Sequence, residues 1–460
     1  MIPVGTWVVR AVENRRPPDV FIVVVDALRA DRLGRGLTPC LDELATRGLR
    51  FANAYAASAW TRPSVASLFT GQLPSRHGIA SFTAVLPESQ VTLAEMLAAS
   101  GYRTAGFSAN PLVDSRNGSA QGFTHFENVG DGDPDPDAKI HAPRVFARVL
   151  AWLDTLSEPV TAPVAVYLHL MDVHGPYRPP EPHRSRIAGP VATVEATEPL
   201  VRRAREANRD RILRGDDRAL AAITDRDAGL LEALYDGEVA GVDAALRDFI
   251  AALRERERLA HALVVVTADH GEEFHDHGDL THGLALYDEV VHVPLLLWQT
   301  DVPRTGVVAD AVSLRDLAAT LLDLVGLPPA PTFDGASFAT MPGTVVDPTA
   351  PRPFAPGHSI LAELPPDLDS PRDMRRHVAA VVQGSTVLLM SPDGTLQAFD
   401  LATDPTQQRP LPITDLAGAI ALRGALAGRP LRTPAFAAGP SVEFVSAVAA
   451  RLRALGYVVP

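Results

Sequence analysis

Three apolar segments of this 460-residue chain are each followed closely by aspartate or histidine. Carboxylates and imidazoles bind divalent metal ions and transfer protons, so these side chains are candidates for catalysis. One such aspartate alone is most simply a turn or helix-capping residue, but three occurrences together favour a single polar site. The segments are residues 20–25 followed by Asp26, residues 164–170 followed by Asp172 and His174, and residues 263–266 followed by Asp269 and His270.

A hydroxyl side chain stands in a further candidate position, in the segment WTRPSVASLFTGQ. Pro63 is favoured in the first turn of a helix and Gly71 at its end, so the spacing predicts a helix over residues 62–70 with Thr61 at its amino end. Thr61 then has two interpretations. Its hydroxyl caps the helix by accepting a backbone N–H, or it lies where free N–H groups and the helix dipole receive an anion. The local sequence alone favours the cap.

The elements that position these residues follow from the hydrophobic pattern. Each apolar run is short and rich in β-branched residues, which is typical of a strand buried on both faces. Helical patterns lie between the runs, for example at residues 38–51 and 91–107. Strands that alternate with helices predict an α/β fold with a mostly parallel sheet. In such sheets ligands bind beyond the carboxyl ends of the strands, where the aspartates and histidines lie.

The composition argues against several classes of protein. The net charge of −13 argues against a nucleic-acid-binding protein. Lys139 is the only lysine, and Cys40 is the only cysteine, so an intrachain disulfide is excluded. No apolar stretch is long enough to span a membrane, and the amino terminus lacks the pattern of a signal peptide. We therefore expect a cytoplasmic protein, or an exported one if the start is mis-assigned.

The second half of the chain contains three further patterns. Residues 181–230 are dense in charged residues and predict an exposed helical insertion, or a lid over the site. The proline-rich residues 345–359 predict a linker. After them, two apolar runs around Pro-Asp-Gly predict a hairpin. The carboxyl-terminal region is therefore expected to form a small antiparallel sheet with a terminal helix.

Taken in order, the motifs of this chain resemble those of the sulfatase branch of the alkaline phosphatase superfamily. The motifs are VVVDALRADRLG, TPCLDELATRGLRFANAYA, WTRPSVASLFTGQLPSRHG, YLHLMDVHGPYRPP, YDGEVAGVD and VVVTADHGEEFHDHG. The resemblance implies an alkaline-phosphatase-like sandwich, with a central mostly parallel sheet flanked by helices and a small carboxyl-terminal α+β subdomain with an antiparallel sheet. We expect the catalytic domain at residues 1–345 and the subdomain at residues 346–460.

The resemblance also implies a role for each candidate residue. Asp26, Asp269 and His270 match metal ligands, and Thr61 falls where the family keeps a nucleophile that also binds the metal. His174 and His282 match positions that contact the transferred anion or protonate the leaving group.

Two further residues are expected to bind the substrate. Asn110 lies near the position of a pocket lysine in sulfatases, and Arg62 follows the nucleophile. A turn before Pro111 is an equally good interpretation of Asn110. His275 and His277 look like loop residues or partners of ligands, and not like ligands themselves.

The nucleophile motif departs from that of a sulfatase. Sulfatases have C/S-x-P-x-R, whose Cys or Ser is oxidised to formylglycine, whereas this chain has Thr61-Arg62-Pro63-Ser64-Val65. Threonine is a secondary alcohol, so its oxidation gives a ketone and not the aldehyde. Cys40 lies outside the motif. The only lysine, Lys139, follows the loop DGDPDPDA, so His, Arg, Asn or backbone N–H groups must take the place of the lysines that bind sulfate in the family.

The metal motif also departs from that of a sulfatase. Ala27 replaces an aspartate of the family's Asp-Asp pair, and Asp269-His270 replaces Asp-Asn. Fewer oxygen ligands and an added imidazole favour Mn²⁺ or Zn²⁺ over Ca²⁺. We expect one divalent metal. A second is compatible with Asp172, His174 and His282, which loosely resemble the second ligand set of two-metal relatives.

These observations predict a metal-dependent hydrolase of phosphate or phosphonate esters, mono- or diesters, that forms a covalent intermediate on Thr61. One alternative is a sulfuric ester hydrolase that works without formylglycine. The other is a catalytically inactive, sulfatase-like binding protein. The expected partner is a small anionic ester; neither nucleic acid nor a membrane span is expected, and the sequence permits a homo-oligomer.

Overall fold

The computed structural model describes residues 16–131, 133, 135, 139–156, 162–214, 218–302, 304–339, 345–346, 352, 359–364, 378–415, 419–426 and 446–454. Its centre is a nine-stranded sheet in the order β11-β10-β2-β9-β6-β1-β5-β3-β4. Strand β9 is antiparallel to β2 and β6, and β11 is antiparallel to β10, while the other pairs are parallel. The strands are β1 Asp19–Val25, β2 Leu49–Tyr55, β3 Arg103–Ser108, β4 His125–Asn128, β5 Val164–Leu170, β6 Ala262–Thr267, β9 His292–Gln299, β10 Gly306–Ser313 and β11 Val345–Val346.

The three apolar segments of the sequence are neighbours at the centre of this sheet. They form β6, β1 and β5, which lie side by side in that order and run parallel. Every residue of the three strands is buried. The predicted mostly parallel sheet is confirmed, and its geometry brings the carboxyl ends of the three strands to one edge.

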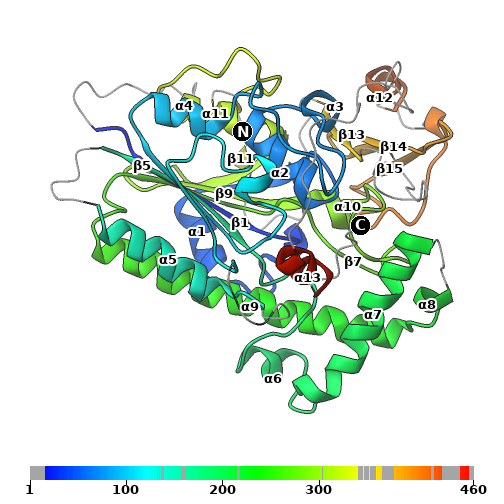
Figure 1. Ribbon diagram of the computed structural model, residues 1–460. Coiled ribbons are helices and arrows are strands. Elements are labelled where there is room, and N and C mark those ends of the chain that lie inside the picture. The colour runs from blue at the N-terminus through cyan, green and yellow to red at the C-terminus, as the bar shows by residue number, and fades with distance from the viewer. Residues whose placement is uncertain are drawn as a thin grey trace.

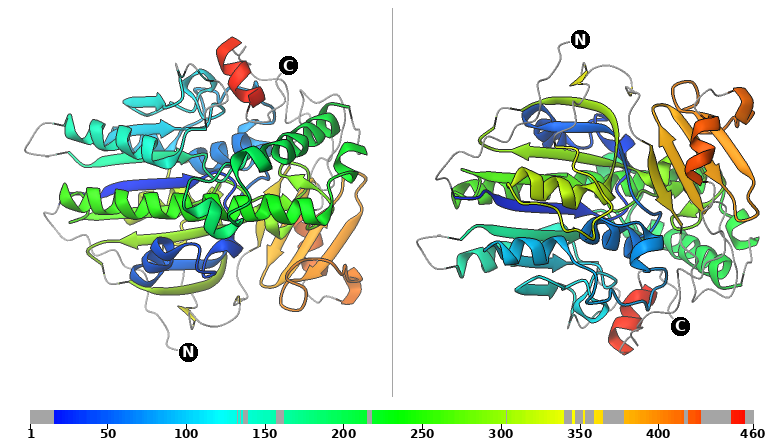
Figure 2. Two further views of the ribbon diagram at one scale, coloured as in Figure 1. Left: turned by 90° about the horizontal axis from the view of Figure 1, so that it is seen from below. Right: turned by 90° about the horizontal axis from the view of Figure 1, so that it is seen from above.

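Helices cover both faces of the sheet (Figure 1). The long helix α9 packs beside α5 and α1 on one face, and α2, α4 and α11 cover the other, as the two views in Figure 2 show. Phe146 of α5 stacks on Phe249 of α9 with ring centroids 4.3 Å apart. The helices are α1 Pro39–Arg47, α2 Thr61–Thr70, α3 Pro74–His77, α4 Leu93–Ala99, α5 Ala142–Asp154, α6 His183–Ile187, α7 Val194–Arg214, α8 Arg218–Ala221, α9 Asp225–Glu255, α10 Asp288–Val291, α11 Leu317–Leu324, α12 Ala419–Leu426 and α13 Ser446–Ala454.

A second, four-stranded antiparallel sheet follows in the chain. It consists of β12 Ile360–Glu363, β13 Ala379–Gln383, β14 Thr386–Met390 and β15 Leu396–Asp400, in that order. Strands β14 and β15 flank the Pro-Asp-Gly turn, so the predicted hairpin is confirmed. One face of the sheet packs on Trp60 and Tyr287 of the main body, and α12 covers the other.

The segment between the two sheets differs in part from the predicted linker. Val345–Val346 forms β11 at the edge of the main sheet, and the half-buried Arg352 contacts Asn53 and Tyr55 of β2. The rest of residues 345–359 lies almost entirely outside the described residues. The terminal helix α13 packs on the main body through Val448 and Leu452. The domain boundary at residue 345 stays a prediction.

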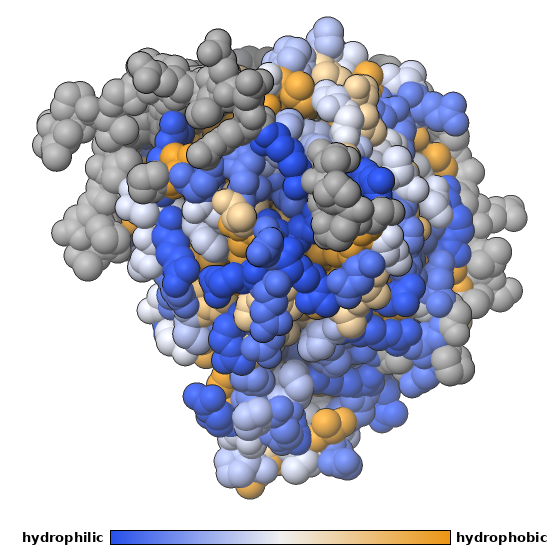
Figure 3. Space-filling model, turned by 90° about the vertical axis from the view of Figure 1, so that its left-hand side faces the viewer, coloured by the Kyte–Doolittle hydropathy of each residue, from blue (hydrophilic) through white to orange (hydrophobic). Residues whose placement is uncertain are grey.

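The charged segment at residues 181–230 is helical, as predicted, and forms α6, α7, α8 and the start of α9. Helix α7 lies near the small hairpin of β7 Glu273–Phe274 and β8 Leu280–Thr281 (Figure 1). The face of the molecule in Figure 3 is mainly hydrophilic, with small scattered apolar groups. Over the described residues, we find no helix with the length and apolar character needed to cross a membrane.

Candidate active site

Polar side chains meet at the carboxyl ends of β1, β5 and β6. Asp26 directly follows β1, and Asp269 lies two residues beyond β6. Val24 pairs with His169 of β5 on one side and with Thr267 of β6 on the other, so these strand ends lie level. The register therefore brings residues from three distant parts of the sequence together.

Asp26, Asp269 and His270 form a buried cluster whose ligand atoms all lie within 4.8 Å of one another. His270 Nε2 lies 3.5 Å from Asp26 Oδ1 and 3.5 Å from Asp269 Oδ2. Ligands on a tetrahedral ion with bonds of about 2.1 Å are about 3.4 Å apart, so these atoms have the spacing of a metal site. The structure thus assembles the three residues whose motif predicts metal binding.

Thr61 completes this cluster from a fourth element. It is the first residue of α2, and its Oγ1 lies 3.3 Å from His270 Nε2. Ser64, one turn later, donates its hydroxyl hydrogen to the Asp269 backbone carbonyl, which fixes α2 against the end of β6. The helix prediction is confirmed, but the capping interpretation of Thr61 is wrong. The capping position is Trp60, whose side chain makes no capping hydrogen bond, and the Thr61 hydroxyl points to the cluster instead.

The second oxygen of Asp26 is held by two buried side chains. Asn110 Nδ2 donates to Asp26 Oδ2 at 2.6 Å, and His169 Nε2 lies 2.9 Å from the same oxygen. Tyr167 OH lies 2.8 Å from His169 Nδ1 and orients that ring. These contacts leave Asp26 Oδ1 directed at His270. They also give Asn110 a role in holding Asp26, while its predicted contact with substrate stays a prediction.

The cluster has the chemical character of a cation site. Among the described residues, Asp26 Oδ1 and Asp269 Oδ2 are buried and have no hydrogen-bond partner. Burial and the Asp26 charge raise the pKa of Asp269 to about 7. Burial alone would raise the pKa of Asp26 too, but His174, His169 and His270 hold that pKa below its usual range. Two buried carboxylates at this separation are stable together when a positive charge lies between them.

The imidazole of His270 is oriented by a backbone carbonyl. Its Nδ1 lies 2.9 Å from the Gly271 oxygen, which can only accept, so Nδ1 carries the hydrogen. The neutral ring therefore directs the lone pair of Nε2 at Thr61 and the two carboxylates. His174 is held in the same way, with Nδ1 2.6 Å from the Gly175 oxygen.

His282 is oriented by a carboxylate. Its Nδ1 lies 2.9 Å from Glu272 Oε1, and Tyr177 OH donates to Glu272 Oε2 at 2.9 Å. The ring centroid of His282 is 4.1 Å from that of His270 and 5.0 Å from that of His174. Burial lowers the pKa of His282 to about 4 and raises the pKa of Glu272 to about 7. The three histidines thus form one group beside Thr61.

Three basic side chains that flank the site are engaged elsewhere. Arg62 donates to the Phe82 and Ala84 carbonyls, so its contacts give no support to the predicted binding of substrate. Lys139 donates to Glu238 Oε1 and to the His174 and Pro176 carbonyls. Arg29 pairs with Asp31 and Asp276 and donates to the Glu272 carbonyl.

The second metal set suggested by the family is not assembled. Asp172 faces away from His282: both of its oxygens accept from Ala142 N at 3.0 and 2.9 Å, and it groups with His141 and Glu238. The reason is the short Asp-Val-His spacing, which puts Asp172 and His174 in different surroundings.

Two other predicted features lie outside the cluster. His277 stacks on Tyr287 at 3.5 Å between ring centroids and contacts Glu289, as a loop residue does. Cys40 is buried in α1, and burial and Asp243 raise the pKa of its thiol to about 12, which makes it unreactive.

Four residues of the site escaped the sequence interpretation: His169, Tyr167, Glu272 and Tyr177. His169 could have been noticed as the one histidine inside the apolar run of β5, and Glu272 as a carboxylate directly after Asp269-His270-Gly271. The tyrosines gave no such signal.

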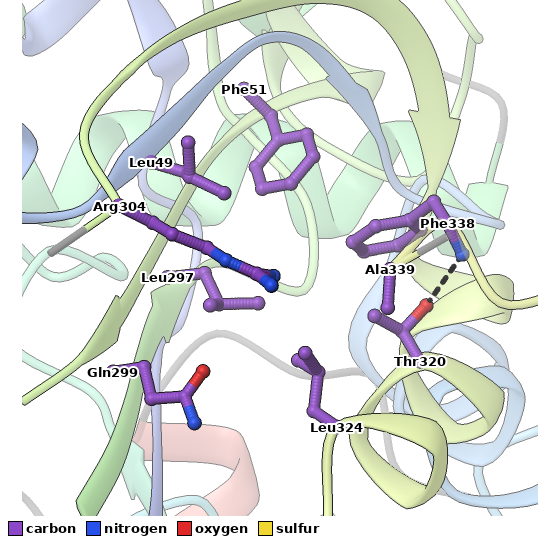
Figure 4. Close-up of a pocket in the computed structure, with 9 residues that line it drawn as sticks. All are labelled: Leu49, Phe51, Leu297, Gln299, Arg304, Thr320, Leu324, Phe338 and Ala339. Carbon is purple, nitrogen blue, oxygen red and sulfur yellow. Dashed lines mark hydrogen bonds between the residues drawn. The ribbon is translucent and has the colours of Figure 1, made fainter. Parts of the chain in front are cut away.

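A pocket elsewhere in the protein is chemically unlike this site. Figure 4 shows its lining, in which Arg304 extends between apolar side chains and Phe338 N donates to Thr320 Oγ1 at 3.1 Å. Leu49 begins β2, which is parallel to β1, so the pocket lies at the amino edge of the sheet, opposite the catalytic candidates. It contains neither a carboxylate nor a histidine.

Comparison with known proteins identifies the family. The Sulfatase family model matches residues 18–327. The Δ4,5-hexuronate-2-O-sulfatase of Bacteroides thetaiotaomicron is 24% identical over 360 residues, which cover 69% of this chain and 70% of that protein. Human arylsulfatase A is 41% identical over 100 residues, only 19% of this chain and 20% of that protein.

Solved structures share the fold. One, in complex with its substrate D-glucosamine-2-N,6-O-disulfate, has a TM-score of 0.68 at 18% identity and covers 90% of this chain and 96% of its own. The phosphonate monoester hydrolase of Agrobacterium radiobacter has a TM-score of 0.64 at 21% identity and covers 89% and 94%. The family depends on divalent metal ions, and this chain carries acidic and histidine groups able to bind one. The chain therefore belongs to the sulfatase family, within the alkaline phosphatase superfamily, and is an ester hydrolase.

Proposed function

We propose that this protein is a metal-dependent hydrolase of phosphate or phosphonate esters that uses Thr61 as a covalent nucleophile. The observation that carries the proposal is the position of Thr61 Oγ1, 3.3 Å from His270 Nε2 and at the amino end of α2. Free N–H groups of the first helical turn and the positive end of the helix dipole attract an anionic ester to this hydroxyl.

Asp26, Asp269, His270 and Thr61 would hold the metal ion. Three oxygens and an imidazole nitrogen favour Mn²⁺ or Zn²⁺ over Ca²⁺. When bound, the ion supplies positive charge that lowers the pKa of the Thr61 hydroxyl and neutralises oxygens of the ester. Asn110 and His169 keep Asp26 in place for this purpose.

The reaction has two displacement steps. The Thr61 hydroxyl releases its proton to solvent, and its Oγ attacks phosphorus while the bond from phosphorus to the leaving oxygen breaks with its electron pair on that oxygen. His282 or His174 donates a proton to the leaving oxygen. Water then attacks the phosphothreonine and gives a proton to the same histidine, and the bond from phosphorus to Thr61 Oγ breaks with its electron pair on Oγ. This restores the deprotonated Thr61 for the next cycle.

The charges around the site favour esters with one negative charge at the reacting centre. Arg62, Lys139 and Arg29 are engaged by carbonyls and carboxylates. The two ligand carboxylates balance a divalent ion, and no flanking Lys or Arg described above is left to neutralise a dianion. Phosphodiesters and phosphonate monoesters therefore suit the site better than phosphate monoesters.

A sulfate ester is the second candidate, and specific observations favour it. The relative of Bacteroides thetaiotaomicron is a 2-O-sulfatase, and one structural neighbour was solved with a disulfated sugar. A sulfate monoester also carries one negative charge, so it meets the same charge balance. Thr61 would then act as an unmodified alcohol, because threonine cannot give the formylglycine aldehyde.

A substrate panel tests this proposal. We expect Mn²⁺- or Zn²⁺-loaded protein to hydrolyse an aryl phosphodiester and an aryl phosphonate monoester faster than an aryl phosphate monoester or an aryl sulfate. If only the aryl sulfate were hydrolysed, the proposed phosphorus substrates would be wrong and the second candidate, a sulfate ester hydrolase, would be correct. Turnover of none, with metal bound, would favour a binding protein.

Substitution of the nucleophile tests the mechanism. We expect Thr61→Ala to lower kcat by at least about 10³-fold and Thr61→Ser to keep part of the activity. Acid quenching during turnover should trap the phosphoryl group on the residue 61 peptide in wild type only. Unchanged kcat in a folded Thr61→Ala variant would contradict a covalent role for this hydroxyl.

A further inference from the structure

A second cluster of potential metal ligands lies behind His174, outside the candidate active site. It contains His141, Asp172 and Glu238, whose ligand atoms all lie within 4.8 Å of one another. His141 Nδ1 is 3.3 Å from Asp172 Oδ1 and 3.9 Å from Glu238 Oε2. These separations bracket the distance of about 3.4 Å between neighbouring ligands on a tetrahedral ion.

Glu238 supplies the observation that points to a ligand. Its side chain is fully buried in the middle of α9, and Oε2 has no hydrogen-bond partner among the described residues. The other oxygen, Oε1, accepts from Lys139 Nζ and Arg178 N, each at 2.7 Å. A buried carboxylate oxygen without a partner is costly, and Glu238 directs this oxygen at His141.

The other two ligands are held in place by their own contacts. Asp172 is 3% exposed, and both oxygens accept from Ala142 N at the start of α5. His141 immediately precedes α5, and its side chain is 33% exposed, which gives an ion a route from solvent. The stacked rings of Phe146 and Phe249 keep α5 and α9 in register.

The charge of the cluster is unbalanced. The cluster holds two carboxylates, Glu238 and Asp172, but only one ammonium, that of Lys139. Lys139 pairs with Glu238, so the basic side chain that contacts Asp172 is His141. Lys139 occupies the Oε1 side of Glu238, so it does not fill the space between Oε2, Asp172 and His141. A divalent cation in that space would turn the net charge from −1 to +1 and satisfy the buried oxygen.

We propose that His141, Asp172 and Glu238 form a second divalent metal site, with one nitrogen and two oxygen ligands suited to Zn²⁺ or Mn²⁺. This set shares only Asp172 with the two-metal arrangement suggested by the family and uses neither His174 nor His282. The ion ties the end of β5 to the start of α5 and the middle of α9. It thereby supports the segment that carries His174, whose carbonyl is bound by Lys139.

Metal counting on the full chain tests the proposal, and substrate is not needed. Chelator-treated protein is loaded with Zn²⁺ or Mn²⁺ alone, and bound ions are counted by native mass spectrometry. We expect two ions in wild type and one in His141→Ala. An Asp26→Asn/Asp269→Asn variant should keep one ion, and adding His141→Ala should remove it. Asp172→Asn should act like His141→Ala.

His183→Ala is the matched control, because His183 is also a partly buried histidine and lies on the neighbouring α6; it should leave the count unchanged. A wild-type protein that binds one ion overturns the proposal, as does a His141→Ala variant that retains both. Loss of the second ion in His277→Ala instead would assign it to the Glu273, His277 and Glu289 cluster and equally overturn the proposal. The active-site metal is counted separately, so failure here leaves the proposed reaction standing.

Discussion

Each of three imidazoles in the candidate site is held at one nitrogen and presents the other. A carbonyl fixes His270 and His174, whereas the Glu272 carboxylate fixes His282. A carboxylate both orients the ring and stabilises its protonated form, which a carbonyl does less well. Burial lowers the pKa of His282 to about 4, but His282 is the histidine of the three whose Nδ1 faces a carboxylate, and we therefore take it as the better candidate for the proton donor to the leaving group.

This difference makes a prediction about Glu272. Glu272→Gln keeps the shape of the side chain but removes its charge, and we expect kcat to fall about 10- to 100-fold with little change in KM. The comparison is a double-mutant cycle with His282→Ala. If Glu272 acts through His282, the glutamine substitution has no further effect in the His282→Ala variant. If the two substitutions lower kcat independently, so that their effects multiply in the double variant, Glu272 does not act by positioning His282.

The residues of the candidate site could be named from the sequence because their motifs are local, while their roles stay predictions. Asp26 directly follows β1, Asp269 and His270 lie two and three residues beyond β6, and Thr61 begins a helix that has a proline in its first turn. The hydroxyl direction of Thr61 could not be predicted, since it depends on His270, more than 200 positions away in the chain. The grouping of Asp172 with His141 and Glu238 was also not foreseen, because these residues lie in three separate segments of the chain.

Among the elements, the turn after β6 is tightly constrained. A Cβ atom on Gly271 would lie 2.1 Å from the Glu289 carbonyl oxygen, so the turn that orients His270 requires glycine. We expect Gly271→Ala to reduce stability by about 1–3 kcal/mol and to impair metal binding. Gly229→Ala is the control: it is exposed on α9 with no atom within 4 Å of the added carbon, and should be neutral or stabilising. Equal melting temperatures of the two variants would contradict this account.

Helices α2 and α3 are joined by a buried histidine. His77 Nδ1 accepts from Ile79 N at 3.1 Å and Nε2 lies 3.0 Å from Ser67 Oγ, an arrangement that requires the neutral ring. Burial lowers the pKa of His77 from 6.5 to about 3. The unfolded chain therefore binds a proton at a higher pH than the folded chain does, and stability from the neutral ring is lost as pH falls below the unfolded value.

A non-titrating variant isolates this effect. We expect the difference in unfolding free energy between wild type and His77→Gln to shrink as pH falls from about 6.5 towards 4, by up to about 1.4 kcal/mol per pH unit. Urea unfolding at several pH values measures it. A difference that is constant with pH would show that His77 does not control this joint.

The order of strands was predictable in part. β-Branched apolar runs and intervening helices predicted a parallel sheet, and β6, β1 and β5 are such runs. The antiparallel β9 was not foreseen, because a buried strand has the same apolar pattern in either direction.

At the scale of the whole molecule, Arg352 connects the segment between the two sheets to the main body. Its guanidinium contacts Asn53, Tyr55 and Asp288. Burial alone would raise the pKa of Asp288, but Arg352 and His292 hold that pKa well below its usual range. Removal of the arginine would leave a buried carboxylate charge with less compensation.

We accordingly expect Arg352→Met to lower the free energy of unfolding by about 3–5 kcal/mol, and Arg352→Met/Asp288→Asn to recover part of the loss. Arg76→Met breaks an exposed pair with Asp334 and should cost less than about 1 kcal/mol. Chemical denaturation compares the three variants. If Arg352→Met and Arg76→Met lowered the free energy of unfolding by similar amounts, the pair of Arg352 with Asp288 would not be important for stability.

The level ends of β6, β1 and β5 have a consequence for how such an enzyme diversifies. Strand register fixes the positions of the candidate site residues. The segments that connect these strands are separate from that register, and one of them, between β5 and β6, contains α6 to α8. Insertions or exchanges in that segment leave the register unchanged. We therefore expect changes in that segment to alter which leaving group is accepted without disturbing the candidate site, and replacing it with the corresponding segment of a relative would test this.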